Sequence, residues 1–195
     1  MSSRNETRGR DGRYDARTVA APELSLNEWV VLALLREAPA HGFALTRELH
    51  QGSDLGRILT VHRPLVYRAL DRLVDAGLAE PQRTEPGDGG PNRVVHRATR
   101  RGSRAAAAWL REPVTHIREM RIEFLLKLRL VERRGDDPGP LVAAQQEALA
   151  DTLGHLTDPG TVDDVVDRWR SHNARATSRF LAELAATEGS VRPVR

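Results

Sequence analysis

Residues 85–91, Glu-Pro-Gly-Asp-Gly-Gly-Pro, interrupt a sequence that elsewhere favours helices. Gly and Pro at most of these positions exclude a helix and favour a tight reversal of the chain. The flanking residues, 78–84 and 92–98, form two short segments that favour extended structure. The pattern predicts a β-hairpin with a glycine-rich tip.

Three amphipathic helices are predicted before this hairpin. The first opens at a capping box formed by Ser25 and Glu28. A second, short helix is expected over 42–51, and a third from about Arg63 to a stop at Gly77. Three helices followed by a hairpin are the element order of a winged helix-turn-helix.

The chain after the hairpin is predicted to be helical. The aromatic content of only 4% also favours helices, because strands are enriched in aromatic residues. Pro- and Gly-containing stretches divide the region into four segments, 99–112, 117–134, 139–156 and 161–187.

Charge is concentrated around the hairpin and the helix before it. Residues 57–104 carry ten arginines against five acidic residues, a local net charge of +5 in a chain whose total is +3. A basic middle between neutral or acidic flanks predicts a surface that binds a polyanion. The alternative is a set of arginines that merely solvate exposed faces.

Several classes of function find no support in the sequence. The chain has no cysteine, which excludes disulfides and thiolate metal sites, and no membrane-spanning apolar run. The seven histidines lack zinc-site spacing, and Asp163, Asp164 and Asp167 are better explained as favourable charges at a helix start. No catalytic motif has a supporting context. We therefore expect no enzyme activity, catalytic residue, metal or cofactor, and a cytoplasmic protein.

The third helix combines a buried stripe with a basic exposed face. Val66, Leu70 and Leu73 are predicted to point inward, which leaves Arg63 and Arg68 exposed. An exposed arginine near the start of such a helix can donate two hydrogen bonds to guanine in the major groove. The alternative is an ordinary surface helix with internal salt bridges. The predicted DNA contacts on this helix and on the hairpin stems are Arg63, Pro64, Leu65, Tyr67, Arg68, Arg72, Arg83, Asn92 and Arg93.

Four motifs in order resemble the PadR family of bacterial transcriptional regulators, in its longer subfamily with a C-terminal helical dimerisation domain. Residues 32–45 resemble the family's P-x-H-G-Y-x-L turn, and residues 65–78 resemble its S-L-Y-x-x-L-x-R-L-x-x-x-G-L recognition helix. Residues 96–102 resemble the exit from the wing, Y-x-L-T-x-x-G, and residues 121–130 the start of the C-terminal domain.

The resemblance covers about residues 24–187 and has informative departures. Pro64 and Leu65 stand where the family often has Gly and usually has Ser or Thr, so the DNA target does not follow by analogy. Phe43 and His96 replace two usual tyrosines. The family also implies small-molecule sensing, for which Trp109, Met120, Phe124 and Trp169 are candidate lining residues; the alternative is that they are plain core.

The helices beyond residue 112 carry more apolar surface than one chain needs. The segment 117–134 is apolar nearly all round, which requires cover on both sides. The last segment, 161–187, carries a further apolar stripe that fits either an intrachain core or a second copy of the chain. The predicted dimerisation residues are Phe124, Leu128, Val165, Trp169, Ala176, Phe180 and Leu184.

We therefore predict a mainly α fold with a small β-hairpin, an N-terminal winged helix-turn-helix and a C-terminal α-helical dimerisation domain. The expected organisation is a disordered basic arm over 1–22, the winged helix over 23–112, the dimerisation domain over 113–187 and a disordered tail over 188–195. The expected function is a sequence-specific repressor that binds a palindromic DNA operator as a homodimer and is released by a small-molecule effector. The alternative is a winged-helix protein-interaction module that does not bind duplex DNA.

Overall fold

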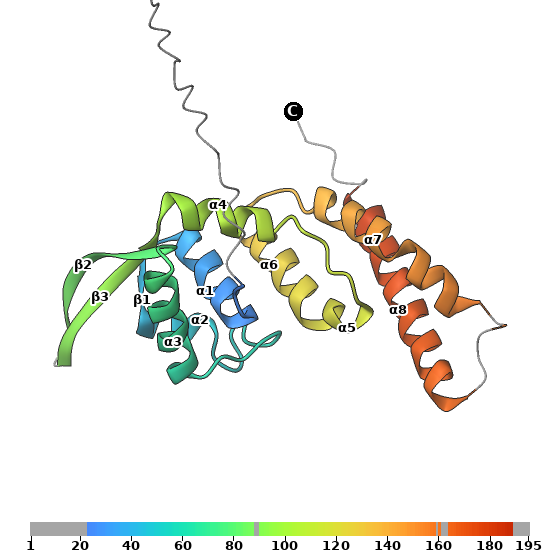
Figure 1. The fold of residues 1–195 in the computed structure, drawn as a ribbon, viewed down its shortest axis with the longest axis horizontal. Coiled ribbons are helices and arrows are strands. Elements are labelled where there is room, and N and C mark those ends of the chain that lie inside the picture. Colours follow the sequence, from blue (N-terminus) through green and yellow to red (C-terminus); the bar gives the residue numbers. More distant parts are fainter. Residues whose placement is uncertain (1–22, 88–89, 159, 161–163, 189–195) are drawn as a thin grey trace, which may run out of the picture.

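The computed structural model describes residues 23–87, 90–158, 160 and 164–188. Figure 1 shows an elongated arrangement, with the β-hairpin at one end and the last two helices at the other. The predicted arm over 1–22 lies outside the described residues, as does 189–195 of the predicted tail. Glu188, placed in that tail by the sequence, instead ends the last helix.

The first three helices form where the local signals predict them. α1 (Leu26–Glu37) opens at the predicted capping box, in which the Ser25 backbone N–H donates to Glu28 Oε2 over 2.7 Å. α2 (Gly42–Glu48) ends three residues earlier than the prediction of 51. α3 (Arg63–Asp75) begins at the predicted residue. Gly77 follows it with φ +66°, a conformation that favours glycine and ends the helix.

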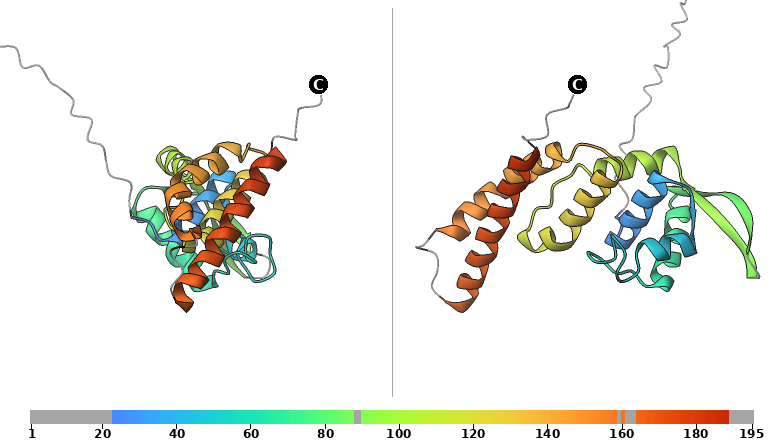
Figure 2. Two further views of the ribbon diagram at one scale, coloured as in Figure 1. Left: turned by 90° about the vertical axis from the view of Figure 1, so that its right-hand side faces the viewer. Right: turned by 180° about the vertical axis from the view of Figure 1, so that it is seen from behind.

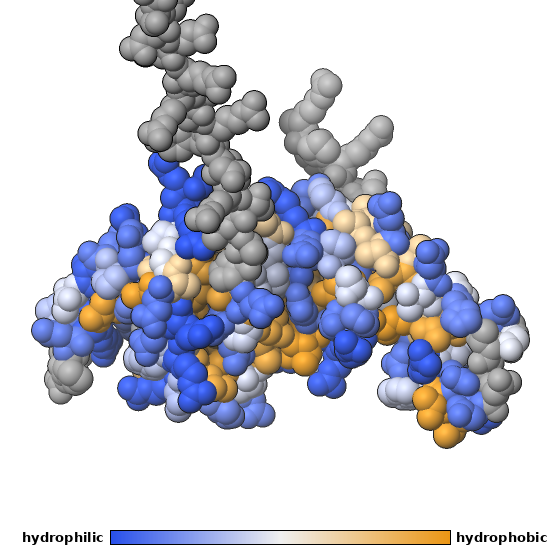
Figure 3. Space-filling view, viewed as in Figure 1, coloured by the Kyte–Doolittle hydropathy of each residue, from blue (hydrophilic) through white to orange (hydrophobic). Residues whose placement is uncertain are grey.

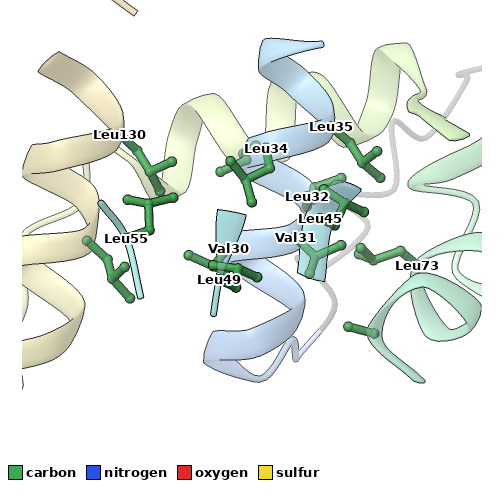
Figure 4. Close-up of a cluster of buried hydrophobic side chains, with 14 of the residues drawn as sticks. Val30, Val31, Leu32, Leu34, Leu35, Leu45, Leu49, Leu55, Leu73 and Leu130 are labelled. Carbon is green, nitrogen blue, oxygen red and sulfur yellow. The ribbon is translucent and has the colours of Figure 1, made fainter. Parts of the chain in front are cut away.

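One hydrophobic core joins these helices. Val30, Val31 and Leu32 of α1 have no exposed surface and meet Leu45 and Leu73 of the next two helices. Figure 4 shows this cluster, in which Leu130 from the C-terminal half lies beside Leu55. The core of the winged helix is therefore completed by a helix that follows it in the chain.

The hairpin is confirmed and gains a third strand. β2 (Ala79–Gly87) and β3 (Gly90–Ala98) pair antiparallel, with irregular register near both ends of β2. β1 (Ala40–His41), a two-residue strand that the sequence did not predict, adds to the other side of β3. Because β1 leads directly into α2, the start of α2 is tied to the wing.

The wing returns to the helices through a tight contact at α4 (Arg100–Trp109). Thr99 caps this helix, since its Oγ1 accepts a hydrogen bond from the Gly102 backbone N–H over 3.0 Å. Gly102 lies against the backbone of Leu78, so that a Cβ added there would come within 2.0 Å of the Leu78 carbonyl oxygen. The start of the wing and its end are thus held together by backbone contacts.

The helix predicted over 117–134 is divided into three pieces. α5 (Ile117–Glu119) leads into a π-helical turn, Met120–Phe124, and then into α6 (Leu125–Arg133). Glu123 lies in the π turn and accepts hydrogen bonds from Trp109 Nε1 over 3.1 Å and from Lys127 Nζ over 2.7 Å. A π turn inserts one residue into a helix and often marks a functional site. Here it brings a carboxylate to a lysine that is only 2% exposed.

The last two helices form an antiparallel pair, α7 (Gly139–Thr157) and α8 (Val165–Glu188), which Figure 2 shows from two sides. α8 buries Ser171, Ala174 and Leu181. Two of these are small residues, which allow close approach of the helices. Over the described residues, no helix is long and apolar enough to cross a membrane.

The predicted dimerisation residues are divided between a core and a surface. Phe124 and Leu128 are buried in a core cluster of the C-terminal half, and Phe180 and Leu184 pack partly against it. Val165, Trp169 and Ala176 are exposed on α8. The first four residues therefore pack within their own chain, and the last three are exposed to solvent in the single chain.

Candidate nucleic-acid interface

The helix α3 has the predicted buried and exposed faces. Val66, Ala69, Leu70 and Leu73 are buried in the core of the winged helix. The six predicted DNA contacts on this helix are all exposed: Arg63, Pro64, Leu65, Tyr67, Arg68 and Arg72. An apolar face directed inward thus presents the other face to solvent.

A groove separates α3 from the wing and brings four predicted residues together. Arg63 and Tyr67 line it from α3, and Asn92 and Arg93 line it from β3. Its volume is about 650 Å³. The remaining lining residues are His41, Gly42, Phe43, Leu70, Asp71, Pro81, Val94 and His96.

Arg63 and Arg93 at this groove, and Arg68 on α3, differ in their partners from Arg83 and Arg97 of the wing. Arg83 pairs with Glu85 on its own strand, with 2.7 Å between Nη2 and Oε1, and Arg97 pairs with Glu80 over the same distance. Within the described part of the chain, no ion pair involves Arg63, Arg68 or Arg93. Their guanidinium groups are therefore free to meet an anionic partner.

A simpler explanation of the charge on Arg93 is a cross-strand salt bridge with Glu85. Glu85 and Arg93 are opposite each other in the β2–β3 register. The Glu85 carboxylate nevertheless binds Arg83, while the Arg93 guanidinium lies over the Phe43 ring, 5.7 Å from its centroid. A cross-strand salt bridge thus does not account for Arg93.

Arg72 has a different environment from the groove residues. Its Nε lies 3.4 Å from Oε1 of Glu28, and the other oxygen of that carboxylate caps α1. Arg72 thus links the second half of α3 to the start of α1. The groove lining includes neither Arg72 nor the other predicted residues Pro64, Leu65, Arg68 and Arg83.

Three lining residues at the start of α2 were not among the DNA contacts predicted from the sequence. His41 accepts a hydrogen bond at Nδ1 from the Ala44 backbone N–H over 3.0 Å and so caps α2. Gly42 and Phe43 follow it in the groove, and Phe43 is 45% exposed. All three lie in the motif that resembles P-x-H-G-Y-x-L, which the sequence argument used only to recognise a turn.

His96 forms part of the groove and has an unusual environment. Its Nδ1 atom is buried and has no hydrogen-bond partner. Burial lowers the pKa of the His96 imidazole below its ordinary value of 6.5, although the Val94 backbone and the charge of Asp71 act in the opposite direction. The groove therefore favours a neutral His96.

This lowered pKa predicts a pH-dependent stability. As the pH falls below about 6.5, the His96 imidazole of the unfolded chain takes up a proton before that of the folded chain. The free energy of unfolding should therefore decrease as the pH falls from 7.5 to about 5.5. The measurement is urea unfolding across this range, with His96→Gln expected to show a weaker dependence and His172→Gln, at an exposed position on α8, an unchanged one. Equal pH dependence in the wild type and His96→Gln would contradict the prediction.

Three of the four candidate effector residues are packed in the core. Trp109, Met120 and Phe124 are buried, and Trp109 stacks on Trp29 with 5.5 Å between ring centroids. Trp169 is 68% exposed and borders a cleft of about 640 Å³ between α5, α7 and α8. The plain-core alternative thus describes the first three residues. Among the described residues, no group of three or more His, Asp or Glu side chains is placed to hold a metal ion.

Comparison with protein families supports the winged helix directly. Residues 31–108 match the model of the transcriptional regulator PadR-like family. Residues 31–108 form a PadR-like domain. The PadR-like match runs from within α1 to the end of α4 and includes the whole groove. The helices α5 to α8 lie beyond it.

Similar solved structures have low sequence identity to this chain. A crystal structure of Bacillus subtilis PadR in complex with operator DNA is 16% identical, with a TM-score of 0.44, and the match covers 82% of this chain and 98% of that one. The crystal structure of smu.1604c from Streptococcus mutans UA159 is 15% identical, with a TM-score of 0.40 and the same two coverages. A comparison with curated proteins found no match.

Proposed function

We propose that this PadR-like protein is a sequence-specific DNA-binding regulator whose α3 enters the major groove and whose wing follows the phosphate backbone. The observation that carries the proposal is the set of arginines without an ion pair on α3 and β3, Arg63, Arg68 and Arg93, of which Arg63 and Arg93 line the groove. The other arginines of α3 and the wing strands, Arg72, Arg83 and Arg97, are held by carboxylates of the chain. Unpaired guanidinium groups on two elements fit base edges on one side and phosphates on the other.

The two elements have different roles in this proposal. Arg63 and Arg68, on the first half of α3, read bases, because this half of such a helix reaches base edges. Asn92 and Arg93 contact phosphate or sugar, which positions the protein without reading sequence. The part of the predicted wing tip at 88–89 lies outside the described residues.

We further propose that the protein acts as a homodimer on a palindromic operator and represses transcription in the cytoplasm. The support for a dimer is an apolar surface at the start of α8, where Val165, Val166 and Trp169 are 75%, 55% and 68% exposed. Figure 3 shows hydrophobic surface at that end of the helix. A two-fold axis would present one winged helix to each half of a palindrome. Release by a small-molecule effector is part of the same proposal, with the cleft beside Trp169 as its place.

The test begins with duplexes selected from random DNA by binding to the wild-type protein. Arg63→Ala and Arg68→Ala should each weaken binding to the selected duplex by about 1–3 kcal/mol, more than to random duplex. Their thermal stability should be nearly unchanged, because both positions are exposed. Arg97→Ala, which removes an exposed arginine already paired with Glu80, is the matched control and should bind like the wild type. Wild-type affinity in both helix variants would contradict the assignment of α3.

A further inference from the structure

Gly42 and Tyr67 make an unusually close contact at the groove. A Cβ added to Gly42 would lie 2.7 Å from Cζ and 2.8 Å from Cε1 of the Tyr67 ring. Real Cβ atoms essentially never come so close to another atom, so the present position of the ring requires glycine at 42. The exposed Tyr67 ring of α3 thus packs directly against the backbone of α2 at Gly42.

The ring of Tyr67 also contacts one of the unpaired arginines, Arg63. The Arg63 guanidinium lies over the Tyr67 ring, with Cζ 5.5 Å from the ring centroid. A cation over an aromatic face at this distance is attracted by the ring quadrupole. The position of Arg63 in the groove therefore depends on Tyr67, and that of Tyr67 depends on Gly42.

Phe43, the next residue of α2, contacts Arg93 on the opposite side of the groove. The Phe43 ring is 45% exposed and lies under the Arg93 guanidinium, 5.7 Å from centroid to Cζ. The His41 ring stacks near Phe43, with 6.3 Å between centroids, and the backbone of His41 pairs with Val95 of β3. The start of α2 is therefore fixed to the wing as well as to α3.

We propose that the first turn of α2, residues 41–43, is a brace that sets the separation between Arg63 of α3 and Arg93 of the wing. Gly42 and Phe43 are positioning residues, which act through Tyr67 and the two arginines. The inference rests on the proposed DNA-binding function and adds to it how the two basic elements are held at a fixed spacing. A guanidinium already stacked in place loses less freedom on binding, which strengthens the contact.

The first experiment alters the backbone position against which the Tyr67 ring packs and changes no charged residue. Gly42→Ala should push the Tyr67 ring out of position, and because that ring is partly exposed it can move into the groove without unfolding the domain. We expect about 2- to 5-fold weaker binding to the selected duplex, the range of an exposed cation–π contact, with little change in melting temperature. Gly154→Ala, at a position in α7 where an added Cβ meets nothing within 4 Å, is the control and should bind like the wild type.

Double variants separate positioning from a general structural effect. Tyr67→Ala should itself weaken binding, and adding Gly42→Ala to it should have no further effect, because the atoms that clash are gone. Phe43→Ala should likewise have no further effect in an Arg93→Ala background. A loss of affinity from Gly42→Ala that is as large with Tyr67→Ala as without it would overturn the brace, and so would wild-type affinity in Gly42→Ala alone.

A measurement without DNA keeps this inference separate from the proposed function. The Arg63 side-chain protons should show a ring-current shift in NMR spectra of the free protein, and this shift should be lost in Tyr67→Ala and altered in Gly42→Ala. An Arg63 shift that neither variant changes would overturn the inference even if DNA binding is confirmed. If the wild type binds no duplex at all, the proposed function is wrong, and so is the inference that rests on it. Failure of the inference alone gives a different result, because the wild type then binds DNA while the variants leave the Arg63 shift unchanged.

Discussion

Gly102→Ala is expected to lower the free energy of unfolding by about 3 kcal/mol, the upper part of the usual range for an overpacked site. The added Cβ would lie 2.0 Å from the carbonyl oxygen of Leu78, a backbone atom that no side-chain rotation can move away. Relief requires a shift of α4 from the start of the wing, which also strains the Thr99 hydrogen bonds to the carbonyl oxygens of Gly77 and Leu78. Urea unfolding of the full chain measures the change.

The control for this prediction is another glycine of a helix. Gly154→Ala introduces the same methyl group in α7, where it meets nothing within 4 Å, and should raise the free energy of unfolding by about 0.5–1 kcal/mol, since alanine favours helices over glycine. If Gly102→Ala unfolds at the same urea concentration as the wild type, this would contradict the close contact between Gly102 of α4 and the backbone of Leu78.

Trp169→Asp is expected to convert the proposed dimer into a monomer. A charge at the centre of the exposed surface of Val165, Val166 and Trp169 would have to be buried without a partner in the proposed interface. Sedimentation should give the wild type twice the mass of the 21.7 kDa chain and Trp169→Asp the mass of one chain. Because the proposed operator complex uses both copies, affinity for a palindromic duplex should fall as well.

A substitution tests this interface more sharply than removal of α8. Ala174 and Leu181 of α8 are buried against the chain's own C-terminal core, so a deletion would damage that core as well as the surface. Arg175→Ala, at an exposed position on the same helix, serves as the control and should remain a dimer. A wild type that sediments as a single chain, or a Trp169→Asp variant that stays dimeric, would move or remove the proposed interface.

The elements of the winged helix could be predicted because their signals are local. The capping box of Ser25 and Glu28, the stop at Gly77 and the Gly- and Pro-rich reversal each depend on neighbouring residues. β1 could not be predicted in this way, because a two-residue strand exists only through its pairing with a segment far along the chain. The π turn at Met120–Phe124 also leaves no clear periodicity, since one inserted residue shifts the stripe of a helix without ending it.

The C-terminal helices show the limit of reading apolar stripes. Periodicity favoured the large residues of α8 as its contact face, including Val165 and Trp169. The face buried against the chain includes Ser171 and Ala174, which hydrophobicity alone does not select. Small residues at a helix contact are chosen by shape, and shape depends on the partner helix.

The candidate site was predicted by residue type but not by partner. Exposure of Arg63 and Arg68 followed from the stripe of α3, and the structure places both as expected. Which arginines are already paired could not be read from the sequence, because Arg72 binds Glu28 of another helix and Arg83 takes the carboxylate that faces Arg93. The brace at Gly42 and Phe43 was missed because a glycine and a phenylalanine in a turn carry no charge signal.

The central claim, that unpaired arginines on α3 and the wing bind duplex DNA, is tested most directly by the salt dependence of wild-type binding. Each phosphate that the protein neutralises contributes about −0.9 to the slope of log affinity against log salt concentration. On a random 30-bp duplex no base is read, so the three unpaired arginines of α3 and β3 can all meet phosphates, which predicts a slope of about −3 or steeper. A selected duplex should be bound more tightly at every salt concentration. Binding that does not change with salt, or no binding to duplex DNA at low salt, would contradict the claim and favour a protein-interaction module.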